Sequence, residues 1–167
     1  MLSKLVVHDI DEPVARDIFS ALPADSRVFA AKPACLPCMG CFGCWVRSPG
    51  QCVLRDRATP LPMLLADARE LVLVSRCVYG GLSPEVKGAM DRSIGYVLPF
   101  FRLLDGEMHH TMRYGNGLRL HLHLYGDIAP EERPIAEALV QAMGRNFGCR
   151  ESRVSFYETP QALAGRV

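Results

Sequence analysis

The stretch Leu71-Val72-Leu73-Val74-Ser75 decides the fold. A near-continuous aliphatic run of this length predicts a β-strand covered on both faces, as in a parallel sheet flanked by helices. The loop that follows, Arg76–Ser83, ends at Ser83-Pro84-Glu85, where serine is a good N-cap and proline suits the first helical position. We therefore expect a buried strand, a loop and then a helix over Pro84–Val97.

The same alternation of strand and helix extends in both directions along the chain. The expected strands are Ser3–His8, Ser26–Ala31, Leu71–Ser75, Leu118–Tyr125 and Val154–Tyr157. The expected helices are Asp11–Leu22, Pro62–Arg69, Pro84–Val97, Pro130–Phe147 and a short one after Pro160, with an irregular stretch over Pro99–Gly117. Strands that alternate with helices pair in parallel through right-handed crossovers. Five of them predict an α/β fold, a three-layer flavodoxin-like sandwich with the strand order 2-1-3-4-5.

In that architecture ligands bind beyond the carboxyl ends of the strands, near the switch between the first and third strands. Four loops should therefore form the site: His8–Asp11, Lys32–Asp56, Arg76–Ser83 and Tyr125–Ala129.

Length and charge limit the classes of function. The 167 residues predict one domain, residues 1–167, with a cysteine-rich loop at about 33–56. Lys and Arg number 19 and Asp and Glu number 18, so the chain lacks the concentrated positive charge that nucleic acid or an anionic membrane surface requires. The apolar runs are too short to span a bilayer, and the first residues do not resemble a signal peptide. We expect a cytoplasmic protein.

Five of the seven cysteines fall within the stretch Cys35–Cys52. Clustering of this kind in a reducing compartment indicates metal binding or thiol chemistry. Cys38, Cys41, Cys44 and Cys52 form a C-x2-C-x2-C-x7-C array, whose glycines let the backbone fold tightly around one centre. Four ligands so close in sequence suit a 4Fe-4S cluster better than a zinc ribbon. Zinc, or a glycine-rich loop of small buried thiols, remains an alternative, and Cys35 is either a spare ligand or has no role.

Two motifs carry a family resemblance. The first is Cys-Met-Gly-Cys-Phe-Gly-Cys-Trp-Val-Arg-Ser-Pro-Gly-Gln-Cys over Cys38–Cys52, followed by Asp56. The second is Val78-Tyr79-Gly80-Gly81-Leu82-Ser83, with Lys87 and Asp91-Arg92 after it. Together they resemble the NADPH-dependent FMN reductase and iron-sulfur flavoprotein group of flavodoxin-like proteins, over roughly residues 3–130.

The resemblance implies an FMN-dependent oxidoreductase that passes electrons between NAD(P)H, or a partner donor, and an acceptor. In some relatives the compact cysteine motif holds an iron-sulfur cluster. The residues that the resemblance places against the isoalloxazine ring are Cys77, Val78, Tyr79, Gly80 and Gly81. Residue chemistry agrees in part, because glycines allow close approach of backbone N–H groups and Tyr79 offers a stacking face. The alternative is an ordinary turn in which Gly80-Gly81 only reverses the chain.

The first loop departs from the family. Relatives follow the first strand with a loop rich in Ser, Thr and Gly that binds phosphate at a helix N-terminus. Here the sequence is His8-Asp9-Ile10-Asp11-Glu12-Pro13, whose carboxylates repel a phosphate and whose proline lacks an N–H. Either the phosphate is held elsewhere, for example by Arg16, or the domain has lost flavin. The second alternative is a non-enzymatic thiol or metal-binding module on the same scaffold.

The histidines and one apolar segment complete the candidates. His121 and His123 share a strand face with Arg119 and Tyr125, as a metal pair or as structural histidines. His109-His110 lies in the stretch expected to be irregular and is either a proton donor in a loop over the flavin or part of a surface loop. Lys87 and Asp91-Arg92 are excluded from the predicted site as an ion-pair face or subunit contact. The apolar segment Tyr96–Phe101 predicts a homodimer, with core packing as the alternative.

Overall fold

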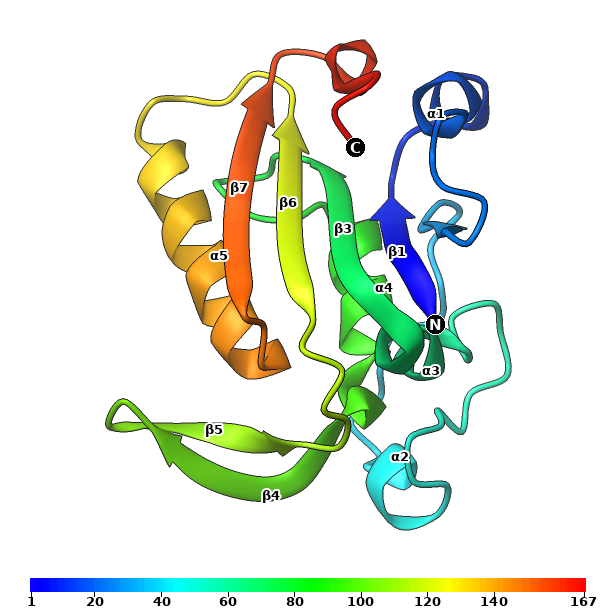
Figure 1. Cartoon of the computed structure of the whole chain (residues 1–167), viewed down its shortest axis with the longest axis vertical. Coiled ribbons are helices and arrows are strands. Elements are labelled where there is room, and N and C mark those ends of the chain that lie inside the picture. Colours follow the sequence, from blue (N-terminus) through cyan, green and yellow to red (C-terminus); the bar gives the residue numbers. More distant parts are fainter.

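The computed structural model describes residues 1–167 and contains a five-stranded parallel sheet (Figure 1). Its strands are β1 (Leu2–His8), β2 (Arg27–Ala30), β3 (Ala68–Arg76), β6 (Arg119–Tyr125) and β7 (Glu151–Tyr157). They pair in the order β2-β1-β3-β6-β7, which is 2-1-3-4-5 when only the strands of this sheet are counted. The predicted fold class is confirmed. No helix has both the length and the apolar character needed to cross a membrane.

Helices cover the two faces of the sheet unequally. The larger core lies on the face packed by α3 (Leu61–Asp67), α4 (Pro84–Asp91) and α5 (Glu132–Phe147). The smaller core lies on the other face, under α1 (Glu12–Phe19) and the 3-10 helix η2 (Pro160–Leu163). Alternate residues of each strand point to opposite faces, so β1 and β3 contribute to both cores.

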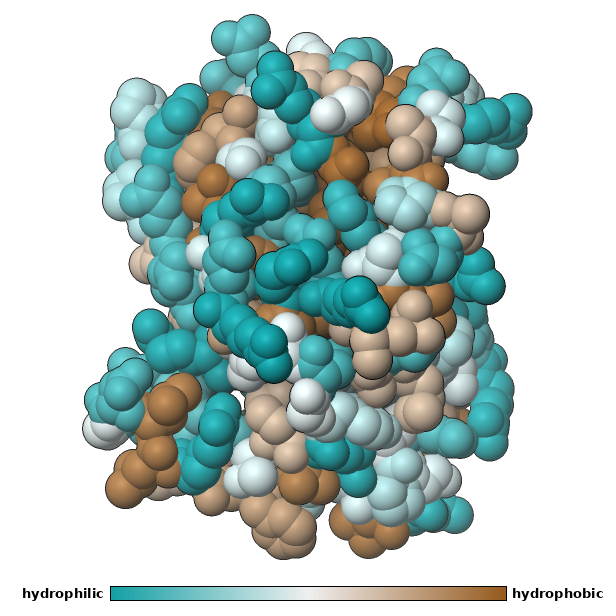
Figure 2. Space-filling view, viewed as in Figure 1, coloured by the Kyte–Doolittle hydropathy of each residue, from teal (hydrophilic) through white to brown (hydrophobic).

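The second face is only partly covered. Beyond α1 and η2, it presents charged side chains in the amino-terminal half of the strands: Lys4, Glu70, Arg119 and Arg153. Figure 2, which views this face, shows hydrophilic side chains across the middle of the molecule. A parallel sheet is usually buried on both faces, so this half-open face is a departure from the architecture.

Helix α4 starts as expected and stops earlier than expected. Ser83 caps it by accepting a hydrogen bond from the amide of Val86 at 3.4 Å. The predicted helix to Val97 is wrong, because α4 ends at Asp91 and a 3-10 turn, η1 (Ile94–Tyr96), follows. Gly95 in this turn packs against the cysteine loop, where a Cβ would lie 3.2 Å from the carbonyl carbon of Gly50.

The stretch Pro99–Gly117, expected to be irregular, is mostly a β-hairpin. Its strands β4 (Val97–Leu104) and β5 (Glu107–Met112) form a separate antiparallel sheet. Asp105 and Gly106 make the turn, with φ of +52° and +82°. Asp-Gly is a strong signal for a tight hairpin turn because both central positions need positive φ.

The cysteine loop leaves the carboxyl end of the sheet and runs to the opposite end (Figure 1). It contains one short helix, α2 (Gly43–Val46), which lies near the hairpin. The carboxyl ends of β3, β6 and β7 point the other way. The cysteine loop and the turn after β3 nevertheless line one cavity, whereas the loops that follow β1 and β6 do not contribute to it.

Candidate functional site

The turn after β3 occupies the carboxyl end of the sheet. Val78 and Gly81 form an isolated β-bridge, with N···O distances of 3.1 and 2.8 Å. Between them Tyr79 and Gly80 have φ of +52° and +76°. A Cβ on Gly80 would lie 2.8 Å from the backbone oxygen of Glu132 in α5, so only glycine fits there. The turn is thus fixed against α5, and the side chain of Tyr79 is 87% exposed.

Cys77, the first of the five residues assigned to the flavin ring, is more enclosed than Tyr79. Its amide donates to the carbonyl of Tyr125 at 2.9 Å, which joins the turn to the end of β6. Burial raises the pKa of its thiol. The structure therefore brings the five predicted ring-binding residues together at the predicted end of the sheet, and their role stays a prediction.

Asp9 has a structural role in the loop after β1. It is 1% exposed, accepts hydrogen bonds from the amide of Arg76 at 3.0 and 3.2 Å, and accepts one from the hydroxyl of Tyr125 at 3.0 Å. Burial, together with the neighbouring Asp9, raises the pKa of Tyr125. The expectation that Asp9 stands as a free charge facing a phosphate is wrong, because its carboxylate is used to join the ends of β3 and β6.

The start of α1 keeps its predicted acidity. Asp11 is the N-cap residue and lies 3.4 Å from Lys32, while Glu12 pairs with Arg16 at 3.1 Å. Pro13 removes one amide donor from the first turn. Arg16, proposed as a phosphate ligand, thus forms an exposed ion pair with an acid of its own helix.

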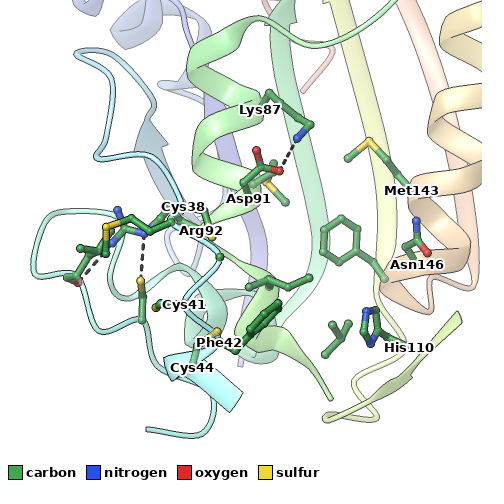
Figure 3. Close-up of a pocket in the computed structure, with 18 of the residues that line it drawn as sticks. Cys38, Cys41, Phe42, Cys44, Lys87, Asp91, Arg92, His110, Met143 and Asn146 are labelled. Carbon is green, nitrogen blue, oxygen red and sulfur yellow. Dashed lines mark hydrogen bonds and ion pairs between the residues drawn. The ribbon is translucent and has the colours of Figure 1, made fainter. Parts of the chain in front are cut away.

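The main cavity lies between α4 and α5, extends from Gly81 and Leu82 in the turn after β3 to the cysteine loop, and has a volume of about 780 Å³ (Figure 3). Its walls come from the cysteine loop, the turn after β3, the two helices and the hairpin. The apolar residues of the wall include Met39, Phe42, Leu82, Met90, Val97, Leu139, Met143 and Phe147. The volume lies within the range of ligand pockets, which are mostly apolar with a few polar groups.

All four cysteines of the predicted array line this cavity. Cys44 is buried, Cys52 is half-buried, and Cys38 and Cys41 are exposed. Burial raises the pKa of Cys44, and the neighbouring thiols add to this effect. No three His, Cys, Asp or Glu side chains lie close enough to bind a single metal ion. The structure thus places the four thiols around one cavity, but too far apart to coordinate a single zinc ion.

Two further thiols, those of Cys35 and Cys149, lie apart from the cavity. Cys35 packs against the larger core, and burial raises the pKa of its thiol. Burial raises the pKa of Cys149 to about 12, so this thiol stays protonated and unreactive at neutral pH.

A buried arginine fixes the cysteine loop to α4. Arg92 is 1% exposed and donates two hydrogen bonds to the carboxylate of Asp56, at 2.9 and 2.8 Å. It also donates to the carbonyl of Leu36 at 2.7 Å and to the sulfur of Cys52 at 3.2 Å. These hydrogen bonds hold the pKa of Asp56 below its usual value. Arg92 is therefore not part of a solvated ion-pair face, because its guanidinium is buried and reaches across 36 residues to the loop that carries the cysteines.

Lys87 and Asp91 also line the cavity, where they form the expected i,i+4 ion pair. The sequence did not indicate that residues of α5 and of the hairpin line this cavity. Met143 and Phe147 were indistinguishable from ordinary core positions of an amphipathic helix.

His109 and His110 belong to β5, at the end of the molecule opposite Tyr79 (Figure 1). They therefore lie on a strand and not in the irregular loop expected, and the role of proton donor stays a prediction. His109 contacts Asn146 of α5 at 3.0 Å. The ring of His110 lines the cavity and lies 5.1 Å from the ring of Trp45.

His121 and His123 are a buried pair on the half-open face. Their ring centroids are 3.7 Å apart, and each ring has one hydrogen-bonding neighbour on β7, Ser155 at 2.9 Å and Tyr157 at 3.1 Å. The Nε2 atom of His123 is buried without a partner. Burial lowers the pKa of His121 to about 4 and that of His123 to about 3, so both rings are neutral at pH 7. No third ligand completes a metal site, which agrees with the structural alternative.

No family model and no curated protein matches the chain. Solved structures resemble it over nearly its whole length. An NADPH-quinone reductase from P. pentosaceus is 11% identical, with 99% of this chain and 95% of that chain covered and a TM-score of 0.60. Smu.1420 from Streptococcus mutans UA159 is 12% identical, with coverages of 99% and 96% and a TM-score of 0.62.

An FMN-dependent NADH-azoreductase from Bacillus anthracis, solved in complex with FMN, is 12% identical, with coverages of 96% and 89% and a TM-score of 0.56. At such low identities the likeness concerns the backbone. The chain therefore has the flavodoxin-like fold that these proteins share.

Proposed function

We propose that the chain is an FMN-dependent oxidoreductase that takes electrons from NAD(P)H. The observation that carries the proposal is Tyr79, a large aromatic side chain that is 87% exposed at the end of the sheet where this fold binds ligands. It is a non-glycine residue at positive φ, and such strain is found mainly where function requires it. A planar ring stacked on Tyr79 would remove this surface from water. Structures of the same fold are described as NADPH-quinone and FMN-dependent NADH reductases.

The two parts of FMN differ in how well they fit the residues present. Tyr79 offers an exposed aromatic face for the isoalloxazine ring, whereas Gly80 is packed against α5. The start of α1 does not fit the phosphate, because Asp11 and Glu12 carry negative charge where the fold normally supplies amides.

The same mismatch favours a second candidate, a thiol or metal-binding module without flavin. Cys38, Cys41, Cys44 and Cys52 would then be the functional residues, since all four line one cavity. A 4Fe-4S cluster spreads its thiolates more widely than a single ion does, so the absence of a single-ion site does not weaken this assignment. Bound there, a cluster would supply one-electron transfer.

Four broader expectations belong to the proposal. The chain would work as a single domain in the cytoplasm, accept electrons from a small-molecule donor such as NAD(P)H, form a homo-oligomer, and bind neither nucleic acid nor membranes. The near-neutral charge supports the last of these.

Purification without oxygen followed by visible absorption spectroscopy separates the candidates. Flavin peaks support the oxidoreductase, a broad shoulder alone supports the cysteine module, and a featureless spectrum calls for FMN titration. In that titration Tyr79→Ala should weaken binding about tenfold, a loss of about 1.4 kcal/mol. Phe100→Ala is the matched control, because Phe100 is also exposed, at 67%, but lies in the hairpin. No FMN binding by the wild-type chain would reject the flavin proposal.

Iron analysis tests the cysteines directly. Replacing any one of Cys38, Cys41, Cys44 or Cys52 with serine should remove the bound iron. Cys35→Ser and Cys149→Ser should not, because both thiols are half-buried and lie apart from the cavity. Equal iron content in all of these variants, or none in the wild-type chain, would contradict the ligand assignment.

A further inference from the structure

The loop after β1 lies beside the turn that carries Tyr79. β1 and β3 are parallel neighbours in the sheet, so their carboxyl ends meet at one edge. Asp9, the first residue after β1, accepts hydrogen bonds from the amide of Arg76, the last residue of β3, at 3.0 and 3.2 Å. A ligand ring stacked on Tyr79 would therefore have the loop after β1 as a neighbour at the same edge of the sheet.

Three backbone positions of this loop cannot donate a hydrogen bond to an anion. The amide of Asp9 donates to the carbonyl of Val74 at 3.3 Å. The amide of Ile10 donates to Nδ1 of His8 at 3.2 Å. Pro13 has no N–H. Phosphate binds at the start of a helix because free amides point toward it, so this loop retains only part of the usual set of donors.

His8 does not supply a positive charge to replace these donors. Its side chain is 3% exposed, and its ring lies 4.9 Å from the ring of Phe19. Burial lowers the pKa of His8, although the neighbouring Asp9 acts in the opposite direction. The imidazole is therefore neutral at pH 7, with Nδ1 as the acceptor for the amide of Ile10.

Two exposed carboxylates stand at the start of α1. The side chains of Asp11 and Glu12 are 80% and 85% exposed. One oxygen of Asp11 pairs with Lys32 and one oxygen of Glu12 pairs with Arg16, which leaves a second oxygen of each carboxylate without a partner. These oxygens accept hydrogen bonds from hydroxyl groups and repel a phosphate. In dinucleotide-binding folds a carboxylate likewise binds a ribose hydroxyl, and an arginine is needed when that hydroxyl carries a phosphate.

We propose that this edge of the sheet binds unphosphorylated flavin in preference to FMN, with the ring on Tyr79 and the hydroxyl groups of the side chain donating to Asp11 and Glu12. The inference rests on the flavin site proposed above and specifies which form of the flavin it accepts. Riboflavin has the ring and the hydroxylated chain of FMN and lacks only the phosphate. Charge acts against the phosphorylated ligand, and hydrogen bonding is retained by the unphosphorylated one, so both contributions favour riboflavin.

Titration by quenching of flavin fluorescence compares the two ligands on the wild-type chain. At an ionic strength of about 0.01 M, riboflavin should bind about tenfold more tightly than FMN. Raising the ionic strength to about 1 M should tighten FMN binding and leave riboflavin binding nearly unchanged, because salt screens the repulsion between phosphate and carboxylates. Equal affinities at low salt, or tighter binding of FMN, would overturn the proposal.

The double variant Asp11→Asn/Glu12→Gln tests the two carboxylates. It keeps groups that accept hydrogen bonds and removes the charge, so FMN affinity should rise about tenfold while riboflavin affinity changes by less than about threefold. Circular dichroism verifies the fold of the variant. Asp105→Asn is the matched control and should change neither affinity, because Asp105 is exposed in the hairpin at the opposite end of the molecule (Figure 1). A double variant that binds FMN no better than the wild-type chain would overturn the role of the acidic loop.

Two outcomes separate this proposal from the flavin proposal on which it rests. If neither flavin binds, the flavin proposal fails and the preference fails with it. If FMN binds more tightly than riboflavin, only the preference is wrong, and Arg76→Gln then tests where the phosphate lies. Arg76 is exposed at the end of β3 and has no ion-pair partner, so loss of the FMN advantage in this variant would assign the phosphate to its guanidinium.

Discussion

Lowering the pH from 7.5 to 5 should remove about 4 kcal/mol from the free energy of unfolding because of the imidazole pair of β6. In the folded chain the pKa values of His121 and His123 are about 4 and about 3, since both rings are buried. In the unfolded chain each ring should titrate near 6.5. Below pH 6.5 the unfolded state therefore binds more protons than the folded state, and stability falls with pH.

The magnitude follows from proton linkage. At pH 5 an imidazole with a pKa of 6.5 gains about 2 kcal/mol from protonation in the unfolded state, while the folded rings gain almost nothing. Two rings give about 4 kcal/mol, a large share of a typical stability of 5–15 kcal/mol. The charged groups around the pair reinforce this direction, because the neighbouring Lys4 and Arg153 further lower the pKa values of both rings.

Urea unfolding at pH 7.5 and pH 5.0 measures the effect. The double variant His121→Gln/His123→Gln should lose much less stability than the wild-type chain, since glutamine does not titrate but can still hydrogen-bond to β7. His110→Gln is the matched control and should lose as much as the wild-type chain, because it leaves the pair unchanged. The reasoning fails if the double variant and the wild-type chain lose the same free energy between the two pH values.

Three further predictions concern the ends of the sheet. Gly80→Ala should lower the free energy of unfolding by more than about 1 kcal/mol, because the new Cβ would collide with α5 and the backbone has a positive φ. Gly88→Ala should raise the free energy of unfolding by about 0.5–1 kcal/mol, because Gly88 lies within α4 with open space around it. Chemical denaturation compares the two variants. Asp56→Asn should cost about 3–5 kcal/mol in thermal unfolding, since it leaves a buried guanidinium without its counter-ion; an unchanged melting temperature would contradict this. Asp11→Ser with Glu12→Thr should tighten FMN binding about tenfold for each 1.4 kcal/mol of repulsion removed, and fluorescence quenching that shows equal affinity would place the phosphate elsewhere.

The strands of the main sheet could be predicted because each has a local pattern. Leu71–Val74 is aliphatic without interruption, and its neighbours carry apolar residues on the faces that the sheet buries. The hairpin could not be found this way, because its apolar residues, such as Phe101 and Leu103, are exposed and so do not mark a buried face. Its only local signal was Asp105-Gly106.

The candidate site shows the same division between local and long-range information. The turn of Tyr79 and Gly80 follows directly from a predicted strand, so its place at the carboxyl end was predictable. The path of the cysteine loop was not, since the loop is long and its direction depends on the distant partner pair Arg92 and Asp56. The cysteine motif indicates a type of chemistry. Contacts with residues far away in sequence determine at which end of the sheet the motif lies.

The half-open sheet face restricts how copies of the chain can associate. Glu70 lies 3.6 Å from Arg119 and 3.9 Å from Arg153, and both guanidinium groups are more than half exposed. To stack two copies through this face would strip water from all of these charges, and the ion pairs already formed leave little new attraction to compensate. Desolvation therefore disfavours contact between copies through this face, although the face is broad and accessible.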